Sequence, residues 1–304
     1  MSQIILEEQV AINENEVESA SSASSIIPGP SRKSVVDWPV SSFIIGVHLV
    51  ALLGIFTFSW KALLLCLFLS WVTGGMGITL GYHRLLTHRS FKVPKWLEYF
   101  LSIIGSLACQ GGPLTWVTAH RIHHAYSDEA KDPHSPVRGF FWAHMGWCLV
   151  KSGLSGNTEV RARICPDLVK DPVHRILDKM QLVWTGLLAL ALYAWGGWSF
   201  VIWGVFVRMV LVYHSTWFVN SAAHVWGYKN YKTNDRSKNL WWVALLTYGE
   251  GWHNNHHAFQ FSARHGLKWW EFDTTYTLIQ VLEFLGLAKA VKIPSKNLLS
   301  QKQL

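Results

Sequence analysis

Charged side chains are scarce in this sequence of 304 residues. Asp, Glu, Lys and Arg make up only 15% of it and apolar residues make up 50%, whereas a soluble domain carries about 25% charged residues. Such a composition excludes an intrinsically disordered protein, which needs low hydrophobicity and high charge. Cysteine is scarce too, and four cysteines in a chain of this length do not form the framework of a small disulfide-rich domain.

Runs of Lys and Arg are also missing. The formal net charge is +8, but the basic residues are scattered singly, so a nucleic-acid-binding patch is not indicated. Residues 1–39 carry a net charge of −4, are rich in Ser and lack the apolar core of a secretory signal. Their acidity also argues against an organelle transit peptide. We therefore expect residues 1–38 to be a disordered tail.

Long apolar stretches, by contrast, are abundant. A helix needs about 20 apolar residues to cross the hydrocarbon core of a bilayer, and the stretches that meet or approach this length are residues 40–60, 62–80, 182–195 and 198–219. Lys61 separates the first two stretches, and Gly196-Gly197 separates the last two. Buried helices of a soluble protein rarely lack charge over such lengths. The sequence therefore predicts two helical hairpins that cross a membrane four times.

The charge of the long polar segments predicts their orientation. Both hairpins turn on the same side, so residues 81–180 and 220–290 lie together on the other side. Residues 81–180 and 220–304 each carry a net charge of +5, and positively charged flanks of membrane spans stay in the cytoplasm. We therefore expect a cytosolic cap built from both segments, with residues 291–304 as a C-terminal tail.

One further apolar stretch, residues 96–117, is interrupted by Gly111-Gly112-Pro113. Paired glycines and a proline break a helix in its middle. We therefore expect this stretch to lie at the membrane interface or to re-enter the membrane, without spanning it.

Nine of the 15 histidines follow a pattern. Residues i, i+3 and i+4 lie on one face of a helix, so each of two His-x-x-His-His boxes presents three imidazoles together, and Asn220 shares a face with His224. The spacing between His83 and His88 turns through about 500° on a regular helix, so we expect the helix to unwind there. The candidate metal ligands are His83, His88, His120, His123, His124, His224, His253, His256 and His257.

Imidazoles crowded in this way cannot all be protonated, because like charges disfavour the charged form. Neutral imidazole is the commonest metal ligand, and nine ligands exceed the coordination of one ion, so we predict two ions. Imidazole suits Zn, Cu, Fe and Ni. A metal pair beside apolar stretches favours oxidation of an acyl chain, which needs a redox metal, so we expect iron, with zinc as an inactive substitute.

The remaining histidines follow no such pattern, and we expect them to be ordinary core or surface residues. Two of them, His134 and His144, lie close enough in sequence to the second box to support the ligands. The six histidines of this set are His48, His134, His144, His174, His214 and His265.

The order and spacing of these motifs resemble those of the membrane fatty-acyl desaturases, the class that includes stearoyl-CoA desaturase. The resemblance covers about residues 40–290 and is nearest to the cyanobacterial and plant-type delta-9 acyl-lipid desaturases. It rests on Gly77-Ile-Thr-Leu-Gly-Tyr-His83-Arg-Leu-Leu-Thr-His88, Ala108-Cys-Gln-Gly-Gly-Pro113, His120-Arg-Ile-His-His124, Asp132-Pro-His134, Asn220-Ser-Ala-Ala-His224, and Gly249-Glu-Gly-Trp-His253-Asn-Asn-His-His257 with the following Ala-Phe-Gln-Phe-Ser-Ala-Arg-His-Gly266.

This resemblance implies an all-α integral membrane protein. Its residues 39–290 would form four transmembrane helices in two hairpins and a helical cytosolic cap that holds a di-iron site. One iron would bind His83, His88, His120, His124 and His256. The other would bind His123, His224, His253 and His257, and would reach Asn220 through water. With O2 and two electrons, the site would place a cis double bond at delta-9 of a saturated C16–C18 acyl chain.

Several alternatives stay open from the sequence. A glycerolipid-linked substrate is favoured, because the N-terminal tail has no compact basic patch for CoA phosphates, and acyl-CoA is the alternative. A membrane di-iron fatty-acid or alkane hydroxylase would share the boxes. A non-catalytic metal-binding membrane protein or transporter fits less well, because transporters carry polar ligands near the middle of the bilayer.

The resemblance also implies partners and a location. We expect ferredoxin as the electron donor, with a cytochrome b-type protein as the alternative, and the basic cytosolic segments suit either acidic partner. A cyanobacterial protein of this kind would lie in the thylakoid or plasma membrane with its boxes on the cytoplasmic side. Trp71 lies 12 residues before His83, about 18 Å along a helix. It would therefore either close an acyl tunnel or be an ordinary packing residue.

Overall fold

A computed structural model describes residues 35–153 and 156–304 of the chain. The predicted tail, residues 1–38, lies outside the described residues except for its last four. Within the described ranges the chain is helical and forms only isolated β-bridges. The helices are α2 (Trp38–Ala51), η1 (Leu52–Ile55), α3 (Trp60–Ser70), η2 (Trp71–Thr87), α4 (Lys95–Ser106), α5 (Pro113–Ala125), η3 (Pro136–Arg138), α6 (Phe140–His144), η4 (Gly146–Leu149), α7 (Thr158–Ile164), α8 (Pro166–Lys170), α9 (Pro172–Leu177), α10 (Gln181–Val201), η5 (Ile202–Val207), α11 (Arg208–Asn220), α12 (Ala222–Val225), α13 (Trp241–Leu246), α14 (His253–Ala258), α15 (Thr274–Phe284) and α16 (Lys296–Lys302).

Three helical runs in the described part of the chain are long and apolar enough to cross a membrane, namely Trp38–Ile55, Trp60–Thr87 and Gln181–Val225. The first two runs are separated at residues 56–59 and not at Lys61, where the sequence placed the junction. The reason is local, because the side chain of Ser59 accepts a hydrogen bond from the backbone N–H of Ala62 and so caps the second run.

The third run is broken at the predicted Gly196-Gly197 pair. Gly197 has φ +64° and ψ −156°, a backbone conformation that only glycine adopts readily. The helical parts before and after the break pack together, because Leu192 lies so close to Gly204 that a Cβ atom there would be 2.6 Å from Leu192 Cδ1. The paired glycines therefore end one helix and start another, as the sequence predicts.

The second run does not unwind at the first histidine box. Residues 71–87 form a π-helix, η2, in which the N–H groups bond the carbonyl five residues earlier. The same spacing continues at its end, where the His88 N–H donates to the His83 carbonyl at 3.1 Å. The wider winding places residues five positions apart on one face, so the expectation of unwinding is wrong. The imidazole rings of His83 and His88 lie 4.7 Å apart.

The interrupted stretch at residues 96–117 forms two helices. The first of them, α4, packs closely against η2, because a Cβ atom at Gly77 would lie 2.6 Å from the backbone nitrogen of Gly105. It ends at Ser106, and α5 starts at Pro113. The predicted break is confirmed, and it leaves α5 free to carry the second histidine box in a different direction.

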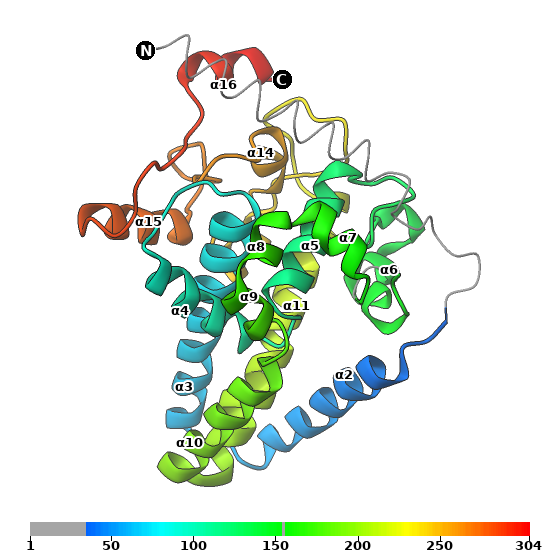
Figure 1. The fold of residues 1–304 in the computed structure, drawn as a ribbon, viewed down its shortest axis with the longest axis vertical. Helices are drawn as coiled ribbons and strands as arrows, with labels where there is room; N and C mark the ends of the chain where they lie inside the picture. The colour runs from blue at the N-terminus through cyan, green and yellow to red at the C-terminus, as the bar shows by residue number, and fades with distance from the viewer. Residues whose placement is uncertain (1–34, 154–155) are drawn as a thin grey trace.

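Figure 1 shows how the long helices relate to the histidine-bearing ones. Helices α3, α10 and α11 extend together away from the part that holds α5 and α14. Residues 291–304, assigned to a tail by sequence, include α16, where Lys302 Nζ donates to the carbonyl of Ala258 at the end of α14 at 2.8 Å. The site-bearing helices thus lie at one end of the bundle of long helices.

Candidate metal centre

Four elements, η2 with His88 directly after it, α5, α12 and α14, bring the nine predicted histidines together. The histidines form two groups, and within each group one ring nitrogen per residue lies within 4.8 Å of the others. The first group is His83, His88, His120, His124 and His256, and the second is His123, His224, His253 and His257. These are the two sets that the resemblance implies. Asn220 belongs to neither group; it ends α11 and lines the cavity described below.

Each His-x-x-His-His box divides its ligands between the two groups. On α5, His123 joins the second group while its neighbour His124 joins the first. Adjacent residues on a helix point about 100° apart, so a single helix placed between two centres serves both. The division of each box between two centres is the one that the resemblance implies.

Four carboxylates lie against the outer side of the groups, each at the Nδ1 atom of one histidine. The pairs are Asp132 Oδ2 with His123 at 3.0 Å, Asp235 Oδ2 with His257 at 2.6 Å, Asp128 Oδ2 with His224 at 3.2 Å, and Glu250 Oε2 with His83 at 2.7 Å. An ionised carboxylate can only accept hydrogen bonds, so the Nδ1 atoms that donate to one, those of His123, His257 and His224, carry the ring proton. The lone pair of each of these rings is then on Nε2, which is the arrangement of metal-binding histidines supported by outer carboxylates.

The Nε2 atoms are spaced as metal ligands would be. His256 Nε2 lies 3.1 Å from His83 Nε2 and 3.0 Å from His124 Nε2, and His253 Nε2 lies 2.9 Å from His224 Nε2. Two nitrogens that bind one ion at right angles, each at about 2.1 Å, lie about 3.0 Å apart. The Nε2 atoms of three further group members are buried and have no hydrogen-bond partner, namely those of His88, His123 and His257. The donor set therefore fits metal ions.

Burial keeps most of the imidazoles neutral. Burial first, and then the neighbouring imidazoles, lowers the pKa well below the ordinary value of 6.5 in His88, His120, His124, His253 and His256. Burial also lowers the pKa of His257, to about 4, against the opposing effect of Asp235. His123 is the exception, because Asp132 overcomes the effect of burial and raises its pKa. Neutral imidazole is the form that binds a metal.

The outer carboxylates stay ionised. Burial alone would raise the pKa of each of them, but the contacting histidines lower the pKa of Asp128, Asp132 and Asp235, and Arg84 together with His83 lowers that of Glu250. Four negative charges therefore lie against the two groups of histidines, where they would stabilise bound cations.

A cavity of about 660 Å³ lies beside both groups. His83, His120 and His253 line it next to the metal-binding groups, and apolar residues of α2 and the second run line it elsewhere. It extends to the first residues of α2 and of α10, and among the described residues its lining contains no Lys or Arg. Besides His83, the second run contributes Gly74, Ile78 and Thr79 to the lining, and Trp71 does not line the cavity.

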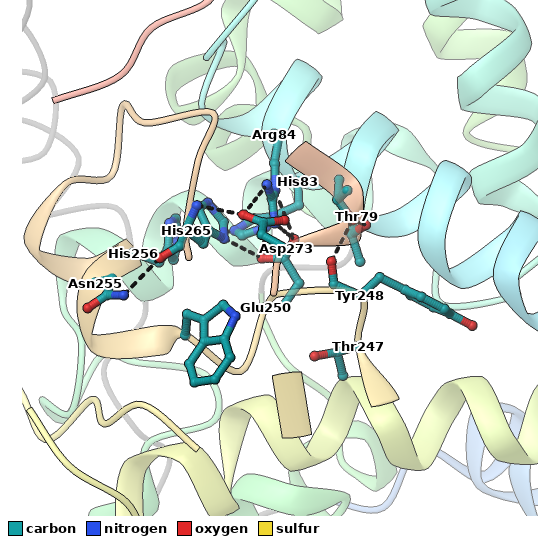
Figure 2. A network of polar contacts seen from close by, with 12 residues as sticks. Thr79, His83, Arg84, Thr247, Tyr248, Glu250, Asn255, His256, His265 and Asp273 are labelled. Atoms are coloured by element: carbon teal, nitrogen blue, oxygen red, sulfur yellow. Dashed lines mark hydrogen bonds and ion pairs between the residues drawn. The ribbon is translucent and has the colours of Figure 1, made fainter. Parts of the chain in front are cut away.

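Sequence reasoning missed several residues of the site. Glu250 lies within a quoted motif but carries no histidine-like signal, and Asp235 is distant from every box. His265 departs from the expectation of an ordinary residue, because its Nδ1 atom lies 3.0 Å from Glu250 Oε2 beside the first group (Figure 2). Three other histidines, His48, His214 and His144, hydrogen-bond to one another in a chain, and none of them belongs to either group.

Comparison with known proteins agrees with this geometry. Residues 58–287 match the model of the fatty acid desaturase family. The chain is 53% identical to the sn-1 stearoyl-lipid 9-desaturase of Anabaena variabilis over 88% of the chain and 98% of that protein. It is 49% identical to the sn-1 stearoyl-lipid 9-desaturase of Synechocystis sp. over 91% of the chain and 87% of that protein. It is also 47% identical to the acyl-CoA C20 Delta5-desaturase of Anemone leveillei, over 84% and 81% respectively.

Proposed function

The chain belongs to the fatty acid desaturase family, and we propose that it introduces a cis double bond at delta-9 of a saturated C16–C18 acyl chain linked to a glycerolipid. The observation that carries this proposal is the apolar cavity that runs beside two groups of inward-facing imidazoles. Similarity to two cyanobacterial proteins named as stearoyl-lipid 9-desaturases supports the position and the lipid linkage.

The proposed cofactor is a pair of iron ions. The first group of five histidines would hold one ion, and the second group of four would hold the other and would reach Asn220, which lines the same cavity, through water. Bound iron would supply the oxidising chemistry, in which O2, two electrons and two protons convert a CH2–CH2 unit into a cis double bond and two waters. The neutral ligands and the four outer carboxylates support two divalent ions.

The chain itself would position the substrate and keep water away. An extended acyl chain in the cavity would lie against His83, His120 and His253, which line it, and holding a reacting bond in place lowers the barrier without any acid or base side chain. The carboxylates of Asp132 and Asp235 accept hydrogen bonds from the Nδ1 atoms of His123 and His257, and so hold these rings with the lone pair of Nε2 directed inward. The protein's part in the reaction is therefore orientation of the chain and of the ligands.

The cavity lining favours a lipid-linked substrate over acyl-CoA. Phosphates are recognised by Arg and Lys side chains, and neither occurs among the lining residues in the described part of the chain, 35–153 and 156–304. The cavity also reaches Asp37 and Val40 at the start of α2 and Gln181 at the start of α10, where two membrane-capable runs begin. A lipid could enter there from the membrane. Acyl-CoA stays the alternative, because a relative named as an acyl-CoA desaturase is 47% identical to the chain.

We propose that the three membrane-capable runs form four spans, with the third run crossing twice around Gly197. The segments between and after the hairpins would form a cytosolic cap, which places the histidine groups on the cytoplasmic side. Ferredoxin is the proposed electron donor, with a cytochrome b-type protein as the alternative. In a cyanobacterial cell the protein would lie in the thylakoid or plasma membrane.

Expression in a host that lacks delta-9 desaturation tests the substrate and the product. Cells are fed labelled stearate, and the label is followed through the acyl-CoA pool and the glycerolipids, with double-bond position and sn-position determined by gas chromatography and mass spectrometry. We expect labelled oleate to appear first in intact glycerolipids. Oleoyl-CoA appearing first would identify the acyl-CoA alternative, and a hydroxylated chain would identify a hydroxylase. A His120→Ala variant provides the inactive control.

A further inference from the structure

Glu250 contacts three basic side chains at once. Its Oε2 atom lies 2.7 Å from His83 Nδ1 and 3.0 Å from His265 Nδ1. Its Oε1 atom accepts a hydrogen bond from Arg84 Nε at 3.0 Å. Figure 2 shows the carboxylate between the two imidazoles and the guanidinium group. One side chain of the outer carboxylate set therefore links a predicted metal ligand to two residues without an assigned role.

The Arg84 side of this arrangement is rigidly held. Arg84 is fully buried, and Nη1 donates to Asp273 Oδ2 at 2.9 Å and to the carbonyl of Ala263 at 2.7 Å. Asp273 in turn accepts the backbone N–H groups of His265 at 2.7 Å and Gly266 at 3.2 Å. The buried guanidinium therefore fixes the Oε1 end of Glu250 and, through Asp273, the backbone of His265.

His265 supports the other end of the carboxylate. It has no exposed surface, and its ring lies 4.3 Å from that of His256 and 5.5 Å from that of His83. Without a donor at this position, Glu250 Oε2 would keep only His83 as a neighbour and could rotate about its terminal bond. A buried carboxylate oxygen that loses a donor is costly, so the imidazole of His265 restricts Glu250 to the rotamer that contacts His83.

We propose that His265 is a positioning residue of the first metal-binding group, which acts through Glu250 to hold His83 with Nε2 turned inward. This inference rests on the proposed function, because it assumes that the first group binds iron. His265 groups with His83 and Glu250 and not with the five histidines of the first group. Its role is therefore to support a ligand, and it is not itself a ligand.

Purified full-length protein loaded with iron tests this role through the rate at which iron is lost to a chelator. His265→Leu removes the donor at similar volume, and His265→Asn keeps an amide N–H at the position of Nδ1, because Asn Nδ2 and His Nδ1 are both bonded to Cγ. Loss of a residue that orients a metal ligand lowers metal affinity about 10- to 100-fold. We expect His265→Leu to lose iron faster by that factor and His265→Asn to stay within about threefold of the native rate.

His174 supplies the matched control. It is also fully buried, with Nδ1 3.3 Å from a carboxylate oxygen of Asp171, but it contacts neither histidine group. His174→Leu should leave the rate of iron loss unchanged. Should His265→Leu not accumulate in the membrane, His265→Met replaces it, because its side chain has no N–H or O–H to donate to Glu250 and the same loss is expected.

The possible outcomes distinguish failure of the proposed function from failure of the proposed role of His265. Native protein that binds no iron overturns the proposed function and this inference with it. Native protein that binds two irons, together with a His265→Leu variant that loses iron at the native rate, overturns this inference alone. Equal acceleration in the Leu and Asn variants would also overturn it, because a donor to Glu250 would then not explain the effect.

Discussion

The Nε2 atoms of His256 and His83 lie 3.1 Å apart, although 173 residues separate the two histidines in the chain. His256 Nε2 is also 3.0 Å from His124 Nε2. One residue of α14 therefore joins the end of η2 to α5, and the first group exists only when all three helices are in place. Such a group depends on the tertiary fold and not on any single histidine box.

We expect His256→Ala to abolish desaturation and to lower the iron bound per chain. Removing a central ligand leaves its neighbours without a common ion, so the loss of activity should exceed about 100-fold, the upper range for residues that only support a ligand. Product is measured by gas chromatography of host lipids, and iron by mass spectrometry of the purified protein. His174→Ala, at a buried site away from both groups, should retain activity and iron. Native iron content in His256→Ala would contradict its assignment as a ligand.

Chain-length preference should depend on Gly74 more than on Trp71. Gly74 lines the cavity, and a Cβ atom there would lie 3.2 Å from the ring of Tyr248, so Gly74→Val fills part of the space for the acyl chain. We expect this variant to favour shorter substrates and Trp71→Ala to change the preference less. The lengths of the monounsaturated products are compared by gas chromatography.

The control for this comparison is Gly46→Val, the same substitution in α2 at a position with nothing within 4 Å of the added Cβ atom. It should leave the chain-length distribution unchanged. A shift produced by Trp71→Ala but not by Gly74→Val would restore Trp71 as the residue that closes the tunnel.

The histidine boxes and the helix breaks could be predicted from the sequence, because both depend on local chemistry. Glycine pairs and proline weaken a helix locally, and Gly196-Gly197 and Gly111-Gly112-Pro113 interrupt helices here, whereas Gly74-Gly75 lies inside η2. Histidines at helical spacing lie close together in any helix. These features need no knowledge of the tertiary fold.

The alignment of His83 with His88 could not be predicted in this way. A regular helix separates residues five positions apart, and only the π-helical winding of η2 brings them together. The outer carboxylates could not be predicted from the sequence for another reason. Asp235 reaches His257 across 22 residues of chain, and an isolated aspartate has no spacing to recognise. The same holds for His265, whose role depends on the position of Glu250.

The turn between the two helices of the third run should tolerate only glycine at position 197. Gly197 has φ +64° with ψ −156°, and a residue with a Cβ atom held there costs about 1–3 kcal/mol. We expect Gly197→Ala to destabilise the protein by that amount, measured as a lower midpoint of thermal unfolding in detergent. Gly186→Ala, inside α10 with open space around the added Cβ atom, should be neutral or stabilising by up to about 1 kcal/mol. Equal effects of the two substitutions would contradict the turn.

Acidification should destabilise the metal-free protein between about pH 6.5 and pH 4. Burial lowers the pKa of His134 to about 3 and that of His257 to about 4, and it lowers the pKa of five further histidines well below 6.5. In the unfolded chain these imidazoles bind protons below about pH 6.5. The unfolded state therefore binds more protons than the folded state in this window, so stability falls as the pH falls.

Each such histidine contributes up to about 1.4 kcal/mol for every pH unit within its window. His123, whose pKa is raised by Asp132, acts in the opposite direction, but it is one residue against seven. We expect the unfolding midpoint of chelator-treated protein to fall steadily from pH 7.5 to pH 5. An unfolding midpoint that does not change over this range would show that burial does not hold the imidazoles neutral. It would therefore contradict the inference that the two groups consist of neutral imidazoles able to bind metal ions.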